Sequence, residues 1–194
     1  MKKSLKLYDT WERYFSPVHP KHKYQVSRFK WFYDRLTPGK FLDVGCAGGL
    51  GLWLAGKRND ITDLHGIDIN PDSIQQAKER LGIYKNKNVV LHSGSADNIP
   101  ENDLYFDCVM CGETLEHVKN DYAVMSEIGR VTASGGRLLV SVPYKGHLSK
   151  QHIRLYDNNS LKKLIENNNF YVITEDKMHA SSKGYYLLMK ATKL

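Results

Sequence analysis

The chain has 194 residues, of which 41% are hydrophobic and 25% charged, a balance typical of one globular domain rather than a disordered or fibrous protein. It contains no apolar run near the roughly 18 residues that a membrane-spanning helix needs, and its basic N-terminal end lacks the apolar stretch of a signal peptide. Three cysteines are too few for a disulfide framework, which favours a reducing, cytoplasmic compartment. Two of them, Cys108 and Cys111, are predicted to lie on opposite faces of one strand.

The formal net charge of +7 is concentrated at the N-terminal end of the chain. Residues 1–35 contain nine Lys and Arg against three Asp and Glu, together with nine aromatic residues, and a turn-forming Thr-Pro-Gly sequence follows. We predict a basic, aromatic-rich helical cap in residues 1–37 and a main domain in residues 38–194. The cap is either a packed layer with solvated lysines or a lid that draws an anionic substrate to the site.

A short buried strand is predicted at residues 41–44, followed directly by a glycine-rich turn and by a helix that begins at Leu50. In such a unit the glycines let a ligand approach the backbone, and the N–H groups of the first helical turn face a negative group. The loop is not the dinucleotide fingerprint, because Ala47 and Leu50 stand where that pattern requires glycine and a small residue. Instead an acid, Asp43, precedes Gly45 by two positions.

Strands and helices alternate along the rest of the chain. Further strands are predicted at residues 62–69, 88–93, 105–111, 137–142, 170–174 and 185–189, and helices at residues 71–81, 122–131 and 158–165. The alternation predicts an α/β fold with a doubly wound, Rossmann-like sheet of seven strands, mostly parallel, and helices on both faces. No helix separates the last two strands, so they should form a C-terminal antiparallel hairpin. Gly135 and Gly136 are expected to turn the chain into the fifth strand.

Asp68 ends the second predicted strand, 19 residues after Gly49. An acid at this place in a strand–loop–helix unit takes both ribose hydroxyl groups of a bound nucleotide. Asn70 and Pro71 follow as the expected N-cap and first residue of the next helix. The spacing therefore predicts ribose binding by Asp68.

The stretch from Asp43 through the glycines resembles motif I of the class I S-adenosylmethionine (SAM)-dependent methyltransferases, and the resemblance covers about residues 38–192. In that family the acid of motif I orients the loop and the methionine end of the cofactor. The resemblance implies that Asp97 binds the exocyclic amine of adenine and that the Ala96 N–H binds a ring nitrogen. The full set of implied cofactor-binding residues is Asp43, Gly45, Cys46, Ala47, Gly48, Asp68, Ile69, Ala96, Asp97, Cys111 and Gly112.

Two later stretches resemble one subgroup of this family. Residues 111–118, Cys-Gly-Glu-Thr-Leu-Glu-His-Val, resemble the signature after the fourth strand of the type 11 and 12 methyltransferases, which include ubiquinone-biosynthesis O-methyltransferases. Residues 151–156, Gln-His-Ile-Arg-Leu-Tyr, resemble the segment that follows their fifth strand. The resemblance implies an enzyme that transfers a methyl group from SAM to a small-molecule acceptor and leaves S-adenosylhomocysteine (SAH). The expected acceptor is a hydroxyl group of an anionic metabolite.

The candidate catalytic residues are Glu113, His117 and His152. Glu113, Glu116 and His117 lie at positions i, i+3 and i+4, which puts them on one face if this stretch is helical. With His152, or alternatively His147, they form a candidate site for a divalent metal such as Mg²⁺, Mn²⁺ or Zn²⁺, which would lower the pKa of a bound hydroxyl group. In one metal-free alternative, His117 or His152 is the general base. In another, Glu113 contacts the cofactor, and Glu116 and His117 stabilise the loop by hydrogen bonds.

The Glu-x-x-Glu-His pattern is also similar to the metal site of small-RNA 3′-end 2′-O-methyltransferases. RNA is therefore the alternative acceptor, and the basic N-terminal end suits it as well as it suits an anionic metabolite. The sequence leaves the metal and the acceptor open, and it gives no oligomeric state.

Overall fold

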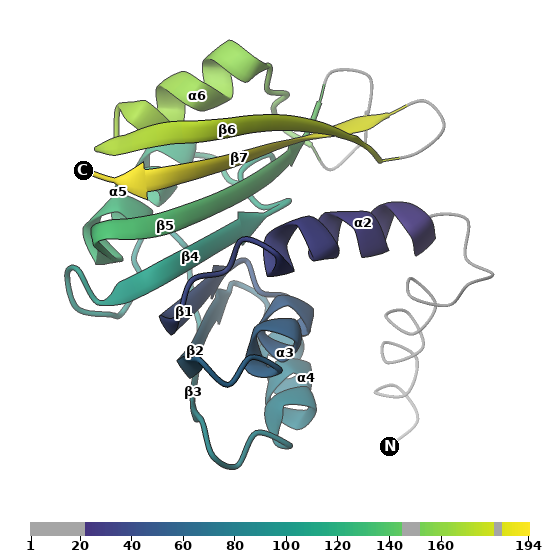
Figure 1. Cartoon of the computed structure of the whole chain (residues 1–194), viewed down its shortest axis with the longest axis vertical. Helices are drawn as coiled ribbons and strands as arrows, with labels where there is room; N and C mark the ends of the chain where they lie inside the picture. Colours follow the sequence, from purple (N-terminus) through teal and green to yellow (C-terminus); the bar gives the residue numbers. More distant parts are fainter. Residues whose placement is uncertain (1–21, 145–151, 181–183) are drawn as a thin grey trace.

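A computed structural model describes residues 22–144, 152–180 and 184–194 (Figure 1). The first part of the predicted cap, residues 1–21, lies outside the described residues, as do the alternative metal ligand His147 and Gln151. The strands are β1 (Gly39–Val44), β2 (Ile61–Asp68), β3 (Asn88–Ser93), β4 (Phe106–Gly112), β5 (Thr132–Pro143), β6 (Phe170–His179) and β7 (Tyr185–Lys193). The helices are α2 (His22–Tyr33), α3 (Leu50–Gly56), α4 (Pro71–Leu81), α5 (Asp121–Val131) and α6 (Asn158–Glu166). Among these helices, none is long and apolar enough to cross a membrane.

The seven strands form one sheet in the order β3-β2-β1-β4-β5-β7-β6. Strands β1 to β5 pair in parallel, and β7 runs antiparallel to both β5 and β6. The predicted fold class, including the antiparallel C-terminal hairpin, is confirmed. Because the chain crosses from β3 back past β1 to begin β4, the strand order reverses between β1 and β4, and ligands bind at the carboxyl ends of strands at such a point.

Helices cover both faces of the sheet (Figure 1). On one face, buried residues of α2, α3 and α4, such as Phe32, Leu52 and Ile74, form one apolar cluster with the sheet. On the other, buried residues of α5 and α6 form a second apolar cluster. Cys108 lies in the first cluster and Cys111 in the second, so the prediction that they lie on opposite faces is confirmed.

Two helices begin where the sequence predicts, because their caps are local. The Asn70 side chain accepts hydrogen bonds from the Asp72 and Ser73 N–H groups in the first turn of α4, whose first residue is Pro71. Asp157 and Ser160 form a reciprocal capping box at the start of α6. The first of these caps matters for the site, since it directs the chain away from the end of β2.

Strands β5, β6 and β7 differ from the prediction at their ends. β5 begins at Thr132, and Gly135, with φ of 75°, lies within it rather than before it. The pairing of β4 with β5 shifts register there, so the glycines form a bulge inside the strand instead of a turn into it. β6 continues to His179 through polar residues of low strand propensity, because backbone pairing with β7 holds it.

Helix α2 packs against the sheet next to β6. Its Trp31 is 6% exposed, and the indole N–H donates a 2.7 Å hydrogen bond to Asp176 of β6. Phe32 is 2% exposed in the same apolar cluster as β1. The described part of the basic N-terminal segment is thus placed beside the carboxyl ends of β1 and β4.

Candidate active site

The loop after β1 has a conformation that requires its glycines. Gly45 and Gly49 have left-handed backbone angles, with φ of 74° and 75°, and a Cβ atom at Gly45 would collide with the side chain of Thr114. Ala47 is also left-handed, with φ of 44°, which costs free energy for a residue that has a side chain. Its N–H donates a 2.9 Å hydrogen bond to Oδ2 of Asp68. The acid at the end of β2 thus fixes the glycine loop at the end of β1.

Asp68 lies between this loop and a large cavity. Its Oδ1 accepts a 2.9 Å hydrogen bond from the Asn70 N–H, so each carboxylate oxygen has one backbone donor and keeps further lone pairs for a ligand. The cavity measures about 620 Å³, within the range of small-molecule sites, and lies at the carboxyl ends of the parallel strands. Six residues predicted to bind cofactor line it: Gly45, Ala47, Asp68, Ile69, Ala96 and Asp97. The structure therefore brings together residues from three separate loops.

A second, smaller cavity of about 170 Å³ lies beneath α2. Gly45, Ala47 and Glu113 line both cavities, so the two adjoin. The five other predicted cofactor residues divide between this cavity and the core. Asp43, Cys46 and Gly112 line the smaller cavity, whereas Gly48 and Cys111 line neither, and Cys111 is fully buried among apolar side chains.

Arg28 of α2 is a buried cation in the wall of the smaller cavity, and the sequence analysis missed it. The residue is 7% exposed, and its guanidinium group lies 3.5 Å from the Glu113 carboxylate and 4.9 Å from the centre of the Tyr186 ring. Its Nη2 donates to Gln25, but within the described residues its Nε and Nη1 make no hydrogen bond. Buried N–H groups of this kind suit an anionic ligand group. The sequence could have indicated Arg28 by its position, because it precedes the apolar Phe32 by four residues and so lies on the same, buried face of the helix.

Three buried carboxyl groups near the cavities retain protons more strongly than usual. Burial raises the pKa of Asp43 to about 8, with a further rise from the Asp68 charge and an opposing effect of Arg28. Burial, followed by the nearby Glu113, raises the pKa of Glu116 to about 9. The pKa of Glu113 is raised by burial, against the lowering effects of Arg28 and of a hydrogen bond from Ser141. Glu116 is therefore mainly a neutral acid at pH 7 in the free protein.

Glu116, His117 and His152 gather at the edge of the larger cavity. Their candidate ligand atoms all lie within 4.8 Å of one another, and His117 Nε2 is 3.7 Å from Glu116 Oε1. Glu116 is fully buried, and within the described residues neither of its carboxyl oxygens has a hydrogen-bond partner. A hydrogen bond of 2.9 Å from the Ile153 N–H to the Glu116 carbonyl holds the segment after β5 against the loop after β4. Two sequence segments more than 30 residues apart thus build one cluster.

The condition for a shared helical face of Glu113, Glu116 and His117 is not met, because this stretch is not a helix. Residues 113–120 form turns, and Glu113 has a left-handed φ of 57°. This backbone points the Glu113 carboxylate toward Arg28 and toward Ser141, whose hydroxyl donates a 3.2 Å hydrogen bond to it. Of the four predicted metal ligands, three cluster and Glu113 does not join them.

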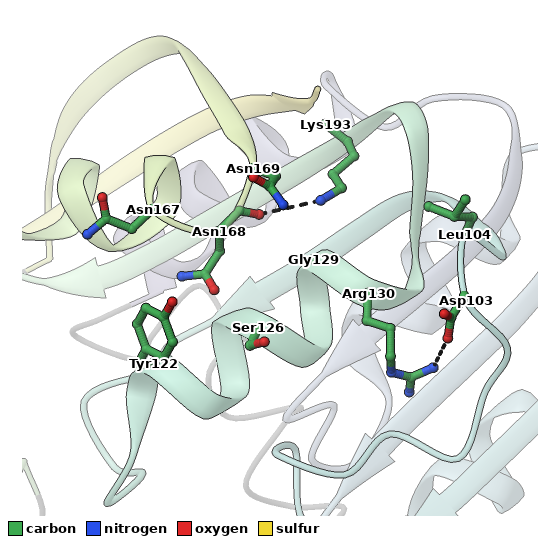
Figure 2. Close-up of a pocket in the computed structure, with 10 residues that line it drawn as sticks. All are labelled: Asp103, Leu104, Tyr122, Ser126, Gly129, Arg130, Asn167, Asn168, Asn169 and Lys193. Carbon is green, nitrogen blue, oxygen red and sulfur yellow. Dashed lines mark hydrogen bonds and ion pairs between the residues drawn. The ribbon is translucent and has the colours of Figure 1, made fainter.

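Another cavity, of about 450 Å³, lies at the opposite ends of the strands, near the start of β4 (Figure 2). It is lined by residues just before β4 and at the ends of α5, α6 and β7, including Arg130, Asn168 and Lys193. In Figure 2 its two cations turn toward groups of the protein itself: Arg130 to Asp103, and Lys193 to the Asn168 carbonyl. Parallel sheets bind ligands at the carboxyl ends of their strands, where Asp68 and the glycine loop lie. The two adjoining cavities are therefore the candidate site.

The raised pKa values of Glu116 and Asp43 predict how stability depends on pH. The folded pKa values, about 9 and about 8, exceed the ordinary values of 4.5 and 3.8, so the folded state binds more protons than the unfolded state between those limits. The protonated carboxyl groups therefore add to the free energy of unfolding. This stabilisation is fully present below the ordinary pKa values and is lost as the pH rises through the folded pKa values of about 8 and about 9.

We therefore expect Glu116→Gln to raise the melting temperature by a few degrees near pH 9 and to have a smaller effect near pH 5. A chain of this size shifts by about 2–4 °C per kcal/mol. Thermal melts followed by circular dichroism across this range measure the effect, with exposed Glu79→Gln as the control. A wild type and a Glu116→Gln variant with parallel pH profiles would contradict the assignment of a buried neutral acid.

The seven-stranded sheet with its antiparallel C-terminal hairpin, the glycine loop after β1 and the cavity at the carboxyl ends of the strands agree with the resemblance to the class I SAM-dependent methyltransferases. A family model described as a methyltransferase domain matches residues 38–192. The chain belongs to this family, and SAM is the methyl donor of the class.

Named relatives agree with this assignment, and a solved structure agrees with the fold. The ubiquinone biosynthesis O-methyltransferases of Thiobacillus denitrificans and Vibrio vulnificus are 34% and 27% identical over 131 and 127 residues. The alignments cover 65% and 66% of this chain but 54% and 53% of those proteins, so the chain spans about half the length of the curated relatives it matches. The crystal structure of the YcgJ protein from Bacillus subtilis has a TM-score of 0.74 and 14% identity, and the match covers 87% of this chain and 98% of that one. At this identity the likeness shows the fold alone.

Proposed function

We propose that the protein transfers the methyl group of SAM to a hydroxyl group of a small anionic metabolite. The observation that carries this proposal is the pair of adjoining cavities, which share Gly45, Ala47 and Glu113 and have the Glu116–His117–His152 cluster beside them. The named relatives are O-methyltransferases, which supports a hydroxyl acceptor. Neither these relatives nor the described residues favour an RNA acceptor.

The residues around the larger cavity fit the nucleoside part of SAM. Asp68 has two carboxylate oxygens with lone pairs remaining after their backbone hydrogen bonds, which suits two ribose hydroxyl groups. Ile69 is 77% exposed and lines the cavity, which offers apolar surface to a base. Ala96 and Asp97 line the same cavity and would bind the adenine edge. Asp43 and Gly45 would hold the methionine end, where the two cavities adjoin.

The cluster of Glu116, His117 and His152 would remove the proton of the acceptor hydroxyl. SAM supplies a methyl group already activated on a sulfonium, so the protein must mainly hold the acceptor in line, exclude water and accept this proton. The His117 side chain is 40% exposed at the cavity edge, which gives an acceptor access to it. If a metal takes part instead, two imidazoles and one carboxyl suit Zn²⁺ or a similar ion better than Mg²⁺.

Positive charge near the smaller cavity supports an anionic acceptor. A hollow of about 570 Å³ between α2 and the end of β6 is lined by Lys23, Tyr24, Lys177 and His179. Lys177 lies 3.5 Å from the centre of the Tyr144 ring, and buried Arg28 lies on the same helix as Lys23. We propose that this surface, together with the cap of residues 1–37, draws the acceptor toward the donor.

Reversing the two lysine charges, Lys23→Glu with Lys177→Glu, should raise the KM for the acceptor by about 10-fold at low salt and weaken its salt dependence. SAM affinity should change less. Steady-state kinetics at several ionic strengths measure the effect, with exposed Lys78→Glu plus Lys85→Glu as a control of equal charge. Deletion of residues 1–20 should act in the same direction. Equal KM values for the two double variants would show that this surface has no role in acceptor binding.

Calorimetric titration with SAM, SAH and NAD tests the cofactor, and a labelled-methyl transfer screen over anionic metabolites and RNA tests the acceptor. We expect SAM and SAH to bind and a hydroxylated metabolite to receive the label. Binding of NAD without SAM would overturn the proposal, and label in RNA alone would overturn the acceptor class.

A further inference from the structure

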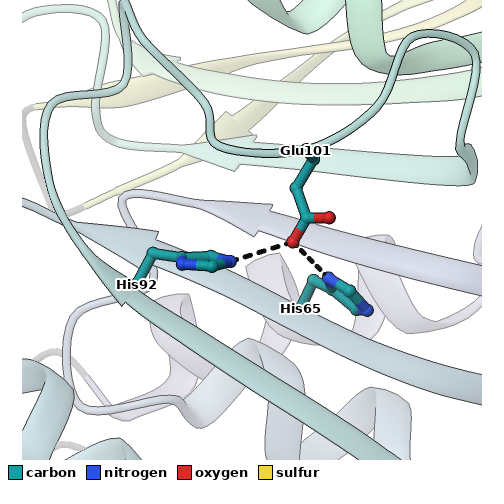
Figure 3. Close-up of side chains that lie close together, drawn as sticks. All are labelled: His65, His92 and Glu101. Atoms are coloured by element: carbon teal, nitrogen blue, oxygen red, sulfur yellow. Dashed lines mark hydrogen bonds and ion pairs between the residues drawn. The ribbon is translucent and has the colours of Figure 1, made fainter.

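We propose that His65, His92 and Glu101 form a binding site for a divalent transition-metal ion, with Zn²⁺ the ion that their donor atoms suit best. His65 lies in β2, His92 in β3 and Glu101 in the segment between β3 and β4. Figure 3 shows both imidazole rings pointing at the same carboxylate oxygen. None of the three residues lines the two cavities of the candidate active site, so the proposal does not depend on methyl transfer.

The sheet brings the two histidines together. In the parallel pairing of β2 with β3, His65 is opposite Val90 and Ile67 is opposite His92. Since side chains alternate along a strand, His65 and His92 project from the same face as diagonal neighbours. Glu101 reaches them because the Arg130 guanidinium group binds its backbone carbonyl at 2.8 Å.

The donor atoms are arranged closely enough for one ion. Glu101 Oε1 lies 2.6 Å from His65 Nδ1 and 2.9 Å from His92 Nε2, and the three atoms all lie within 4.8 Å of one another. Ligand atoms about 2.0–2.1 Å from a tetrahedral ion lie about 3.3 Å apart, so metal uptake requires Glu101 Oε1 to move away from His65 Nδ1 by about 0.7 Å and from His92 Nε2 by about 0.4 Å. The Glu101 carboxylate would supply the larger movement, and the open side of His92, whose side chain is 29% exposed, leaves room for water as a fourth ligand.

Hydrogen bonding alone leaves His65 poorly satisfied. Its side chain is 4% exposed and packs against the rings of Tyr105 and Phe106, with centroid distances of 5.5 and 5.1 Å. Its second ring nitrogen, Nε2, is buried and has no hydrogen-bond partner within the described residues. A metal ion at Nδ1 would leave this second nitrogen protonated and still without a partner, so the metal site is supported by the spacing of the three donor atoms and not by Nε2. Two imidazoles and one carboxylate, with water completing the set, are donors that Zn²⁺ prefers over Mg²⁺ or Ca²⁺.

An ion in this site would connect two strands to the loop that lines the larger cavity. Residues 94–97 of that loop face the cavity, and Glu101 follows four residues later. The metal would therefore stabilise the segment from β3 to β4 without taking part in chemistry.

The test is calorimetric titration of Zn²⁺ into the full chain after treatment with a chelator. His117→Ala plus His152→Ala serves as the background, because it removes the other cluster of candidate ligands. This background should bind Zn²⁺ at His65, His92 and Glu101, and addition of His92→Gln should weaken that binding at least about 100-fold. His179→Gln, at an exposed histidine outside both clusters, is the matched control and should retain the ion.

Absence of Zn²⁺ binding in the background variant would overturn the proposal. So would an ion that remains, with unchanged stoichiometry and affinity, after His92→Gln. If thermal melts without metal show that His92→Gln is unfolded, Glu101→Gln replaces it, because the amide keeps the size of the carboxyl group but is a weaker ligand.

Discussion

Asp68→Ala should weaken SAM binding by roughly 1–3 kcal/mol, about 5- to 150-fold in the dissociation constant, because charge-assisted hydrogen bonds are lost. Two effects combine. The carboxylate would no longer meet the ribose, and the Ala47 and Asn70 N–H groups, each 2.9 Å from it, would lose their acceptor. Ala47 would then have less reason to keep its left-handed backbone, so the glycine loop should become less ordered before any ligand arrives.

Titration calorimetry with SAM and SAH measures this loss for Asp68→Ala. Asp72→Ala is the matched control, since Asp72 is an exposed acid in the first turn of α4 and lines neither cavity. Asp68→Asn separates the two effects, because one amide oxygen can still accept from the loop while the charge is gone. An unchanged SAM affinity in Asp68→Ala would show that the ribose lies elsewhere.

The cluster of Glu116, His117 and His152 should decide the rate of methyl transfer. If a histidine is the general base, His117→Ala or His152→Ala should lower kcat by roughly 10²–10⁴-fold, while SAM affinity changes little. A chelator should then leave kcat unchanged, since the ion proposed at His65, His92 and Glu101 takes no part in the chemistry. The expected reason is geometric: these three side chains gather beside the larger cavity and come from two distant segments.

If a metal ion takes part, we expect different results from the chelator and from the variants of this cluster. A chelator should abolish transfer while SAM still binds, and Zn²⁺, Mn²⁺ or Mg²⁺ should restore it. Glu116→Gln should then copy the chelator, because removal of one ligand from a small set opens the site. Glu79→Gln, on the exposed face of α4, is the control for the carboxyl-to-amide change. Should the chelator and all three substitutions leave kcat intact, proximity and orientation alone would account for the reaction.

The cavity proposed for the cofactor could be predicted from the sequence because the signals of its lining residues are local. The spacing of Asp43, the glycines and Asp68 lies within one strand–loop–helix–strand unit, and the Asn70 cap that directs the chain away is a short-range pattern. The structure places Asp68, Ala96 and Asp97 around one cavity, as the predicted strand ends require.

The surroundings of Glu113 and of the Glu116–His117–His152 cluster could not be predicted to the same extent, since they depend on contacts between distant segments and on unusual backbone angles. Helical spacing cannot predict that Glu113 has a positive φ. It also cannot predict that the Glu113 side chain points toward Arg28, which lies 85 residues earlier in the chain. Arg28 itself acquires its role only when α2 packs against the sheet. His65 and Glu101 meet across 36 residues because strand register and the Arg130 contact bring them together.

The position of β7 has a consequence for the order in which the protein is made. β7 follows β6 in the sequence, yet it lies between β5 and β6, and among the described residues β6 pairs with no other strand (Figure 1). While the nascent chain emerges from the ribosome, β1 to β5 can pair in parallel, but β5 has an open edge until residues 185–193 are available. During that interval β6 is a strand without a partner, and open edges of this kind favour association with other chains. Translation speed across the last two strands should therefore influence how much of the protein reaches its native state.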